Sequence, residues 1–458
     1  MKIFKQEEKG LFPLLFTIIA FIGSLFLISP SMSGKYPVIQ LKLTDWLNLN
    51  FTFDSLAVFM ALCSSFIGAL IVFYSFGYMK DSTPGRDVPY RHLGEYYSFI
   101  ALFIGSMLGL IFSTNLLLMY IFWEITTICS WRLIGFYREK QHLANADKAF
   151  YITFFGSAMM LIGMEIIYQQ FGTLNLTQLR GAPVDNLALL LILLGILSKS
   201  AQLPFQIWLP TAGVAPSPVT ALLHAAVLVK IGVYAFARIF CWTFHTPIPW
   251  SNIVPVIAVI GAFVSACCAL VENDMKRILA YSTISQIAYI LLGLSLNTTV
   301  GITGGLLFIL VHGLGKAGLF LCAGVVEHET KEKDIRKLGG MFKTMPIAGI
   351  SFILCALSIM GIPPFGGFWS KLFIITATVQ SGHFIIAGVA IITAILTMVY
   401  LIRFFNKVFM GEPTNPSCRE KSFPMLFTVM TLGILGLVVG CFVKLPLNLI
   451  RTAVEQMK

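Results

Sequence analysis

Long apolar runs dominate this chain and restrict what it can fold into. Thirteen of them lie between charged or Pro/Gly-rich breaks, near positions 11–29, 52–79, 96–113, 114–136, 148–170, 186–212, 218–241, 251–271, 277–296, 299–326, 344–380, 383–406 and 423–443. Crossing the hydrocarbon core of a bilayer takes about 20 apolar residues of helix. The sequence therefore predicts an all-α polytopic membrane protein with about 13–14 transmembrane helices.

The composition excludes a soluble enzyme of this size. Only 12% of the 458 residues are charged and 57% are hydrophobic, whereas a water-facing surface needs roughly a quarter to a third of charged residues. The first run follows a polar start and has no small-x-small cleavage site, so we interpret it as a retained span rather than a signal peptide. We expect one membrane domain over residues 1–458.

The basic residues sort to one side of the predicted membrane. If the N-terminus is cytoplasmic, nineteen Lys and Arg residues fall in inside loops and six fall outside. This positive-inside bias predicts a multi-pass protein of the cell (inner) membrane with a cytoplasmic N-terminus. It also explains the net charge of +11 without a nucleic-acid partner. Arg132, Arg238 and Arg403 lie near predicted helix ends, where snorkelling to the interface is expected.

Four lysines lie well inside apolar runs, and they are Lys199, Lys230, Lys316 and Lys371. A lysine at the bilayer centre costs about 3 kcal/mol on insertion scales, so four of them require a polar interior or a water-filled path. Four other ionisable residues accompany them at membrane depth: Glu124, Glu165, His224 and His312. Together they predict an intramembrane ion path.

Two of the predicted spans contain helix breakers beside a lysine. Pro204 follows Lys199 by five residues, and Pro363 and Pro364 precede Lys371. A proline removes a backbone donor and clashes with the preceding turn, so a helix should break at each site. Corresponding broken helices in two halves are typical of inverted-repeat transporters. We expect a first repeat near 96–241 and a second near 251–406.

Each ionisable residue also has a plainer interpretation. Glu124 is either the partner of a buried lysine or a protonated carboxyl bonded to a neighbouring helix, and Glu165 suits a polar contact between helices better than a site. His312 and Lys316 are four apart and share a helix face, whereas His224 and Lys230, six apart, differ by about a third of a turn. The glycines between them suit close helix packing.

No cofactor is predicted for this chain. Two membrane histidines could ligate haem, but paired histidines on each of two helices are absent from the sequence. Nine cysteines occur without a C-x-x-C motif, which gives no support for a zinc or iron–sulfur site. The phosphate-binding motif G-x-x-x-x-G-K-[ST] is absent as well, so an ATP-driven pump is not indicated.

Six motifs resemble those of a known family: LLLMYIFWE, SKSAQLPFQIWLP, PSPVTALLHAAVLVKIGVYAFAR, DMKRILAYSTISQIAYI, VHGLGKAGLFLCAG and GIPPFGGFWSK. The chain is similar, from about 50 to 410, to the antiporter-like proton-translocating membrane subunits of respiratory complex I. That family is shared with membrane-bound energy-converting hydrogenases and Mrp-type sodium/proton antiporters. Many members have a second histidine four residues before the equivalent of His312, where this sequence has Phe308. Members usually also have an additional helix before the first span predicted here.

The resemblance implies proton translocation through seven residues: Glu124, Lys199, His224, Lys230, His312, Lys316 and Lys371. It makes Glu124 the carboxylate paired with Lys199, and it implies loading at Lys199 and discharge near Lys371. The chain would then be a subunit of a proton-translocating oxidoreductase without a redox centre of its own. Its implied partners are homologous antiporter-like and other membrane-arm subunits, a peripheral redox arm in another chain, and lipids.

Three other functions remain open on the sequence. The chain could belong to a multisubunit Mrp-type antiporter that exchanges Na⁺ for H⁺ without electron transfer. It could be the membrane subunit of an inorganic-carbon uptake system. The least favoured alternative is an assembly scaffold with silent charges, because four buried lysines are costly to keep for structure alone.

Overall fold

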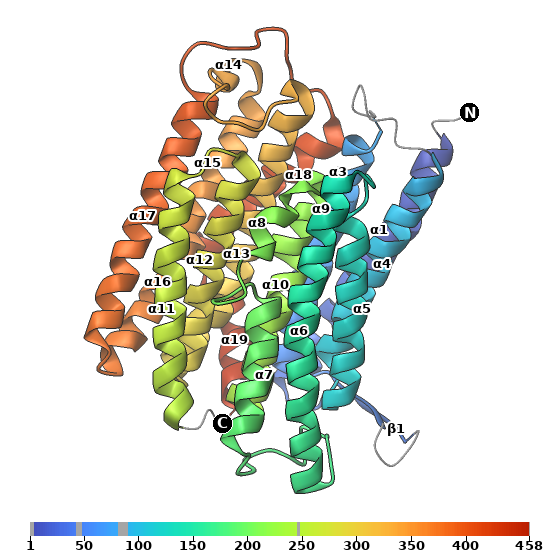
Figure 1. Cartoon of the computed structure of the whole chain (residues 1–458), viewed down its shortest axis with the longest axis vertical. Coiled ribbons are helices and arrows are strands. Elements are labelled where there is room, and N and C mark those ends of the chain that lie inside the picture. The colour runs from blue at the N-terminus through green and yellow to red at the C-terminus, as the bar shows by residue number, and fades with distance from the viewer. Residues whose placement is uncertain (1–3, 43–47, 81–89, 245–247, 458) are drawn as a thin grey trace.

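The computed structural model describes residues 4–42, 48–80, 90–244 and 248–457, and it is a bundle of long, roughly parallel helices (Figure 1). The first part of the bundle contains α1 (Phe4–Phe26), α2 (Ile28–Met32), β1 (Val38–Lys42), β2 (Asn48–Thr52), α3 (Ser55–Tyr78), α4 (Tyr90–Phe112), α5 (Leu116–Ile134), α6 (Lys140–Phe171), α7 (Asn186–Lys199), α8 (Trp208–Thr211), η1 (Ala212–Val214), α9 (Ser217–Ala221), η2 (Leu222–Ala226), α10 (Leu228–Phe236) and η3 (Ala237–Thr243). The second part contains α11 (Ile248–Val271), α12 (Met275–Ser295), α13 (Thr299–Thr330), α14 (Met341–Thr344), α15 (Pro346–Met360), α16 (Gly366–Gln380), α17 (Phe384–Phe409), α18 (Phe423–Cys441) and α19 (Lys444–Met457).

The predicted all-α membrane fold is confirmed. Eleven of the described helical segments are long and apolar enough to cross a membrane. The other two predicted spans, 186–212 and 344–380, are split into α7 with α8 and into α15 with α16. Both proline sites therefore break their helices, as the sequence predicts.

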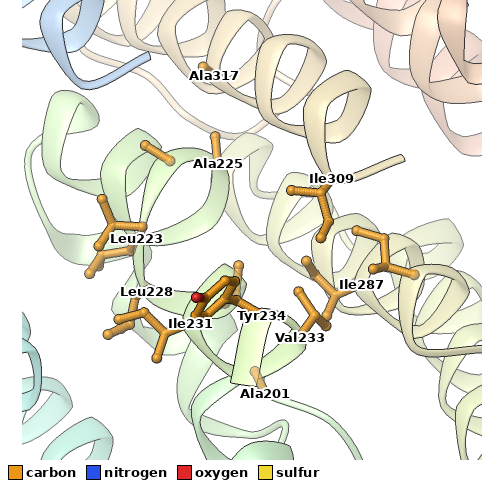
Figure 2. Packing of buried hydrophobic residues seen from close by; sticks show 14 of the residues in the cluster. Ala201, Leu223, Ala225, Leu228, Ile231, Val233, Tyr234, Ile287, Ile309 and Ala317 are labelled. Atoms are coloured by element: carbon orange, nitrogen blue, oxygen red, sulfur yellow. The ribbon is translucent and has the colours of Figure 1, made fainter. Parts of the chain in front are cut away.

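The centre of the bundle consists of the α9–η3 segment, α12 and α13. In the most apolar 18-residue stretch of the α9–η3 segment, all residues are buried within the chain, and in those of α12 and α13 94% are buried. The corresponding shares are 22% for α1 and 39% for α17. Figure 2 shows the Val233 side chain of α10 beside Ile287 of α12 in this core, with Ile309 of α13 near them. The ionisable residues of the central helices are thus removed from lipid.

Two elements at the lower end of the bundle in Figure 1 are not predicted by the sequence analysis. A β-hairpin pairs Val38 with Thr52 in antiparallel register, and its second strand leads into α3, which Asp54 caps by accepting from the Ala57 N–H. The amphipathic helix α19 packs against α3, α13 and η3. Both are too short to span a bilayer, so a search for long apolar runs overlooks them.

Two matching loop contacts relate α4–α7 to α11–α15. Asn115 caps α5 and forms an isolated antiparallel bridge with Asn175, and Asp274 caps α12 and forms one with Asp334. Asn115 precedes Asp274 by 159 positions, and Asn175 precedes Asp334 by the same number. The α4–α5 connection lies at the lower end of the bundle and the α11–α12 connection at the upper end (Figure 1). This opposite placement agrees with an inverted relation between the two halves, and the repeat boundaries near 96–241 and 251–406 stay a prediction.

Candidate functional site

Lys199 is the last residue of α7, directly before the first break, and its side chain is fully buried. Its ammonium donates to Thr127 Oγ1 at 2.7 Å and to the Trp123 carbonyl at 3.1 Å, and it lies 5.4 Å from the centroid of the Trp123 ring. The close packing of α7 on α6 fixes this position, because a side chain on Gly156 would collide with Ser198. Lys199 is therefore held by neutral oxygens of α5.

Glu124 does not form the direct ion pair with Lys199 that the family resemblance implies. The two charges act on each other, but no ion pair within 4 Å joins them among the described residues. Glu124 is half-buried, and one of its carboxylate oxygens is buried without a hydrogen-bond partner there. Glu165 is exposed and accepts from Gln169 Nε2 at 3.0 Å, which is a surface contact.

His224 and Lys230 lie on either side of a change in helix geometry. Residues Leu222–Ala226 form a π-helical turn, η2. The prediction that the two side chains differ by a third of a turn assumed a regular α-helix, so it does not apply here. Neither ring nitrogen of His224 nor the Lys230 ammonium has a hydrogen-bond partner in the described structure. The His224 ring lies against that of Phe320 on α13, with 4.4 Å between centroids.

Gly232 brings the helix of Lys230 against the end of α7. A Cβ atom at this position would lie 2.7 Å from the Ile196 carbonyl oxygen and 2.8 Å from Ser200 Cβ. A residue with a side chain would push α10 away from the segment that carries Lys199. Small residues commonly allow helices in membranes to approach in this way.

Lys316 is one turn after His312 on α13, and both side chains are fully buried. The Lys316 ammonium donates to Ser282 Oγ at 2.5 Å and to the Leu279 carbonyl at 3.3 Å, both on α12. Ser282 Oγ is in turn 2.6 Å from the Tyr400 hydroxyl on α17. A chain of two hydroxyls, from Tyr400 through Ser282, thus ends on this lysine. Neither Ser282 nor Tyr400 is predicted from the sequence.

Lys371 lies on α16, after the second break, and is 4% exposed. Its ammonium donates to the carbonyls of Ile359 at 2.8 Å and Met360 at 3.3 Å, which are the last residues of α15. The rings of Tyr289 and Phe308 lie 5.2 and 5.8 Å from the nitrogen. The broken helix therefore supplies the carbonyls that bind this lysine, which is how interrupted membrane helices form ion sites.

These residues form one buried series between the two breaks. Lys230 Nζ lies against Gly313, between His312 and Lys316 in the sequence of α13, and the Phe308 ring lies 6.3 Å from the His312 ring and 5.8 Å from Lys371 Nζ. None of the four lysines of this series forms an ion pair with a carboxylate among the residues described, whereas Lys276, which is also buried, pairs with Glu327. Lys199, Lys316 and Lys371 donate to neutral oxygens, and Lys230 has no acceptor in the described structure, so the arrangement does not require any one lysine to stay charged.

The prediction that the Arg238 side chain snorkels to the membrane interface is wrong. It is fully buried and forms a bidentate ion pair with Asp54, with nitrogen–oxygen distances of 2.5 and 2.8 Å. Its Nε also donates to the Tyr234 hydroxyl at 3.2 Å. The pair ties the segment after Lys230 to the start of α3, and a single sequence offers no signal that Asp54 faces Arg238.

A polar cavity of about 430 Å³ opens among the upper loops and helix ends. Its lining includes His142, Lys276 and Glu327, and Lys276 Nζ lies 2.6 Å from a Glu327 oxygen. The Ser217 hydroxyl donates to Glu327 at 3.2 Å, and Ser217 begins α9, whose chain leads into η2 and His224. Glu327 thus links the lining of the cavity to the start of the segment that carries His224.

No metal or disulfide site is found in the described part of the chain. No group of three or more His, Cys, Asp or Glu side chains there is arranged to hold a metal ion. The nine cysteines are unbridged.

Comparison with known proteins identifies the family. The profile of the family described as "NADH:quinone oxidoreductase/Mrp antiporter, TM" matches residues 113–397, and that of "NADH-Ubiquinone oxidoreductase (complex I), chain 5 N-terminus" matches residues 44–87. The first match covers the two breaks and all seven residues of the predicted path.

Two named relatives agree with this match. The chain is 34% identical, over a 483-residue alignment, to the Na(+)/H(+) antiporter subunit A1 of Staphylococcus haemolyticus, with 96% of this chain and 58% of that protein covered. It is 33% identical to the corresponding subunit of Staphylococcus aureus, with 96% and 59% covered. The chain therefore spans somewhat more than half the length of these curated relatives.

The fold matches chains from two solved membrane complexes. A chain of the Mrp complex from Dietzia sp. DQ12-45-1b superposes with a TM-score of 0.90 at 23% identity, covering 99% of this chain and 93% of that one. A chain of the membrane-bound sulfane sulfur reductase, an archaeal respiratory complex, superposes with a TM-score of 0.87 at 23% identity, covering 98% and 92%. The fold, the motifs and the family match agree, and the chain belongs to the antiporter-like membrane subunits shared by NADH:quinone oxidoreductases and Mrp antiporters.

Proposed function

We propose that this chain translocates protons as an antiporter-like subunit of a multi-subunit membrane complex. The observation that supports the proposal best is the buried series of four lysines, three of which donate to neutral oxygens, with two buried histidines between the first lysine and the last. A buried lysine without a carboxylate partner can exist as the amine or the ammonium, because losing its proton leaves no unpaired negative charge behind. Such a group can accept a proton on one side and release it on the other.

The proposed path begins at Lys199 and ends near Lys371. From Lys199 a proton would pass through His224 and Lys230 to His312 and Lys316, and then to Lys371 and the outer face. The cavity beside Glu327 and Ser217 is the proposed point of access from the inside, since the basic inside loops lie at the same end of the bundle. Glu124 acts in this scheme through its charge on Lys199 rather than through direct contact.

Two kinds of complex would use such a subunit. In the first, a redox arm in another chain drives proton movement, as the family resemblance implies. In the second, a Mrp-type assembly exchanges Na⁺ for H⁺, and the names of the relatives at 33–34% identity favour this alternative. In both, the chain sits in the cell membrane with a cytoplasmic N-terminus and packs against homologous subunits.

Proton transport in inside-out vesicles tests the proposal. Vesicles that carry the assembled complex are energised with NADH or given a Na⁺ pulse, and quenching of a pH-sensitive acridine dye reports proton movement. Lys199→Ala should abolish the transport that depends on this complex. Lys343→Ala, which removes an exposed lysine of α14 paired with Glu412, is the matched control and should leave transport unchanged.

The same vesicles distinguish the two complexes. A response to Na⁺ without a reductant supports the Mrp-type function, and a response to a reductant without Na⁺ supports the redox-driven one. Wild-type transport by an assembled Lys199→Ala complex would contradict the proposed proton path itself.

A further inference from the structure

The π-helical turn η2 of the first half faces Gly313 on α13 of the second half. A Cβ atom at Gly313 would lie 3.4 Å from the Ala225 carbonyl oxygen and 2.6 Å from Ile67 Cδ1, and it would collide with Lys230 Nζ. Figure 2 shows Ala225 near α13, on the same side as Ala317. The two halves therefore meet at a residue that has no side chain, and the Lys230 ammonium occupies the space.

Three buried groups without hydrogen-bond partners in the described structure converge on this contact. They are the Lys230 ammonium and the rings of His224 and His312, and all three residues are 0% exposed. His312 directly precedes Gly313, Lys230 Nζ lies against Gly313, and His224 belongs to the π-helical turn whose Ala225 carbonyl faces Gly313. Polar groups at such depth usually have partners, so an unpartnered set at one helix contact indicates a functional role.

We propose that Gly313 is a positioning residue at the point where protons cross from the first half of the chain to the second. Its missing side chain lets the Lys230 ammonium rest against α13 beside His312. The two groups are not hydrogen-bonded to each other in the described structure, so a bridging water carries one proton from the ammonium to a neutral His312 ring nitrogen, which leaves an amine on Lys230 and an imidazolium on His312. His312 then passes the proton toward Lys316 one turn away. This inference rests on the proposed function.

Gly313→Ala tests the inference in the assembled complex. The methyl group takes the space of the ammonium, and displacing a reacting group by about 1 Å can cost a hundredfold in rate. We expect initial rates of proton transport to fall about tenfold or more while assembly on native gels stays normal. The pH profile of the remaining transport should also shift, since Lys230 then titrates in a different environment.

A matched control and a double variant separate positioning from packing. Gly305→Ala lies on the same helix, where the three atoms nearest to the new Cβ belong to the Leu294 side chain and the Ile290 carbonyl, at 3.1–3.2 Å, and it should keep most of the activity. Ile67→Val removes the Cδ1 methyl that the new methyl group at position 313 would press on. If Gly313→Ala fails only by overpacking, adding Ile67→Val restores transport, which would overturn the inference.

The outcome is distinguishable from a failure of the proposed function. Loss of transport in both Lys199→Ala and Gly313→Ala, without rescue by Ile67→Val, supports the crossing point. Loss in Lys199→Ala with normal transport and an unchanged pH profile in Gly313→Ala overturns only the inference. Normal transport in Lys199→Ala overturns the proposed path as a whole.

Discussion

Lys199 donates a hydrogen bond to the hydroxyl of Thr127 at 2.7 Å, rather than to the carboxylate of Glu124 on the same helix. Thr127 is fully buried, and its own hydroxyl also reaches the Trp123 carbonyl at 3.1 Å. A hydroxyl can orient an ammonium without fixing its charge. The first lysine of the series is therefore positioned by α5 and remains able to change its protonation state.

Thr127→Val should slow proton transport about tenfold without preventing assembly. Valine has nearly the same shape but offers no acceptor, and a hydrogen bond to a charged group contributes about 1.5–3 kcal/mol. Thr127→Ser keeps the hydroxyl and should retain most of the rate. Initial rates in vesicles measure both variants, and equal rates for valine and serine would show that the hydroxyl is unimportant.

Tyr400→Phe should change transport through Lys316, although Tyr400 does not touch the lysine. The variant removes only the hydroxyl that lies 2.6 Å from Ser282 Oγ, so the ring packing is preserved. We expect a severalfold lower rate and an altered pH profile, because Ser282 is then free to turn away from the ammonium. Ser282→Ala should have a larger effect, and the double variant should be no worse than Ser282→Ala alone. Additive effects would argue against a single hydroxyl chain.

Asp54→Ala should destabilise the protein strongly. It leaves the Arg238 guanidinium buried without its carboxylate, and breaking a buried ion pair in this way costs about 3–5 kcal/mol. The expected result is a markedly lower melting temperature in detergent, followed by intrinsic tryptophan fluorescence. Asp334→Ala breaks an exposed loop pair with Arg336 and serves as the control, for which little change is expected. Similar melting temperatures for both variants would contradict the structural importance of the buried pair.

Glu420 should make stability depend on pH through the start of α15. Its two oxygens accept from the backbone N–H groups of Ile347 and Ala348 at 2.7 and 3.0 Å. Burial raises the pKa of Glu420 above its ordinary value, and these two bonds offset the effect only in part. The protonated form is thus favoured in the folded state, so this contribution to stability is present below the ordinary carboxyl pKa of about 4.3 and is lost as pH rises through the folded pKa.

Melting temperatures of wild type and Glu420→Gln across this pH range test the point. Wild type should lose stability relative to the glutamine variant as pH increases from about 4. A difference between the two proteins that stays constant with pH would show that the ionisation of Glu420 is not involved.

The sequence predicts the helices and the breaks well, because long apolar runs and prolines act locally. Pro204, Pro363 and Pro364 interrupt their own helices, whichever other helices pack beside them. The partners of the buried groups depend instead on contacts far apart in the chain, such as Lys316 with Ser282 and Arg238 with Asp54. The π turn before Lys230 is also beyond a periodicity argument, since every count of residues per turn assumes a regular helix.

In the part of the chain described, Lys199, Lys230, Lys316 and Lys371 have no carboxylate partner, and this has an electrical consequence. Each proton that enters the series adds a full positive charge to the membrane interior instead of being neutralised where it lands. Moving one such charge across the membrane is worth about 2.3 kcal/mol per 100 mV. The membrane voltage would therefore act directly on the occupancy of the lysines, and each one occupied would repel the arrival of the next.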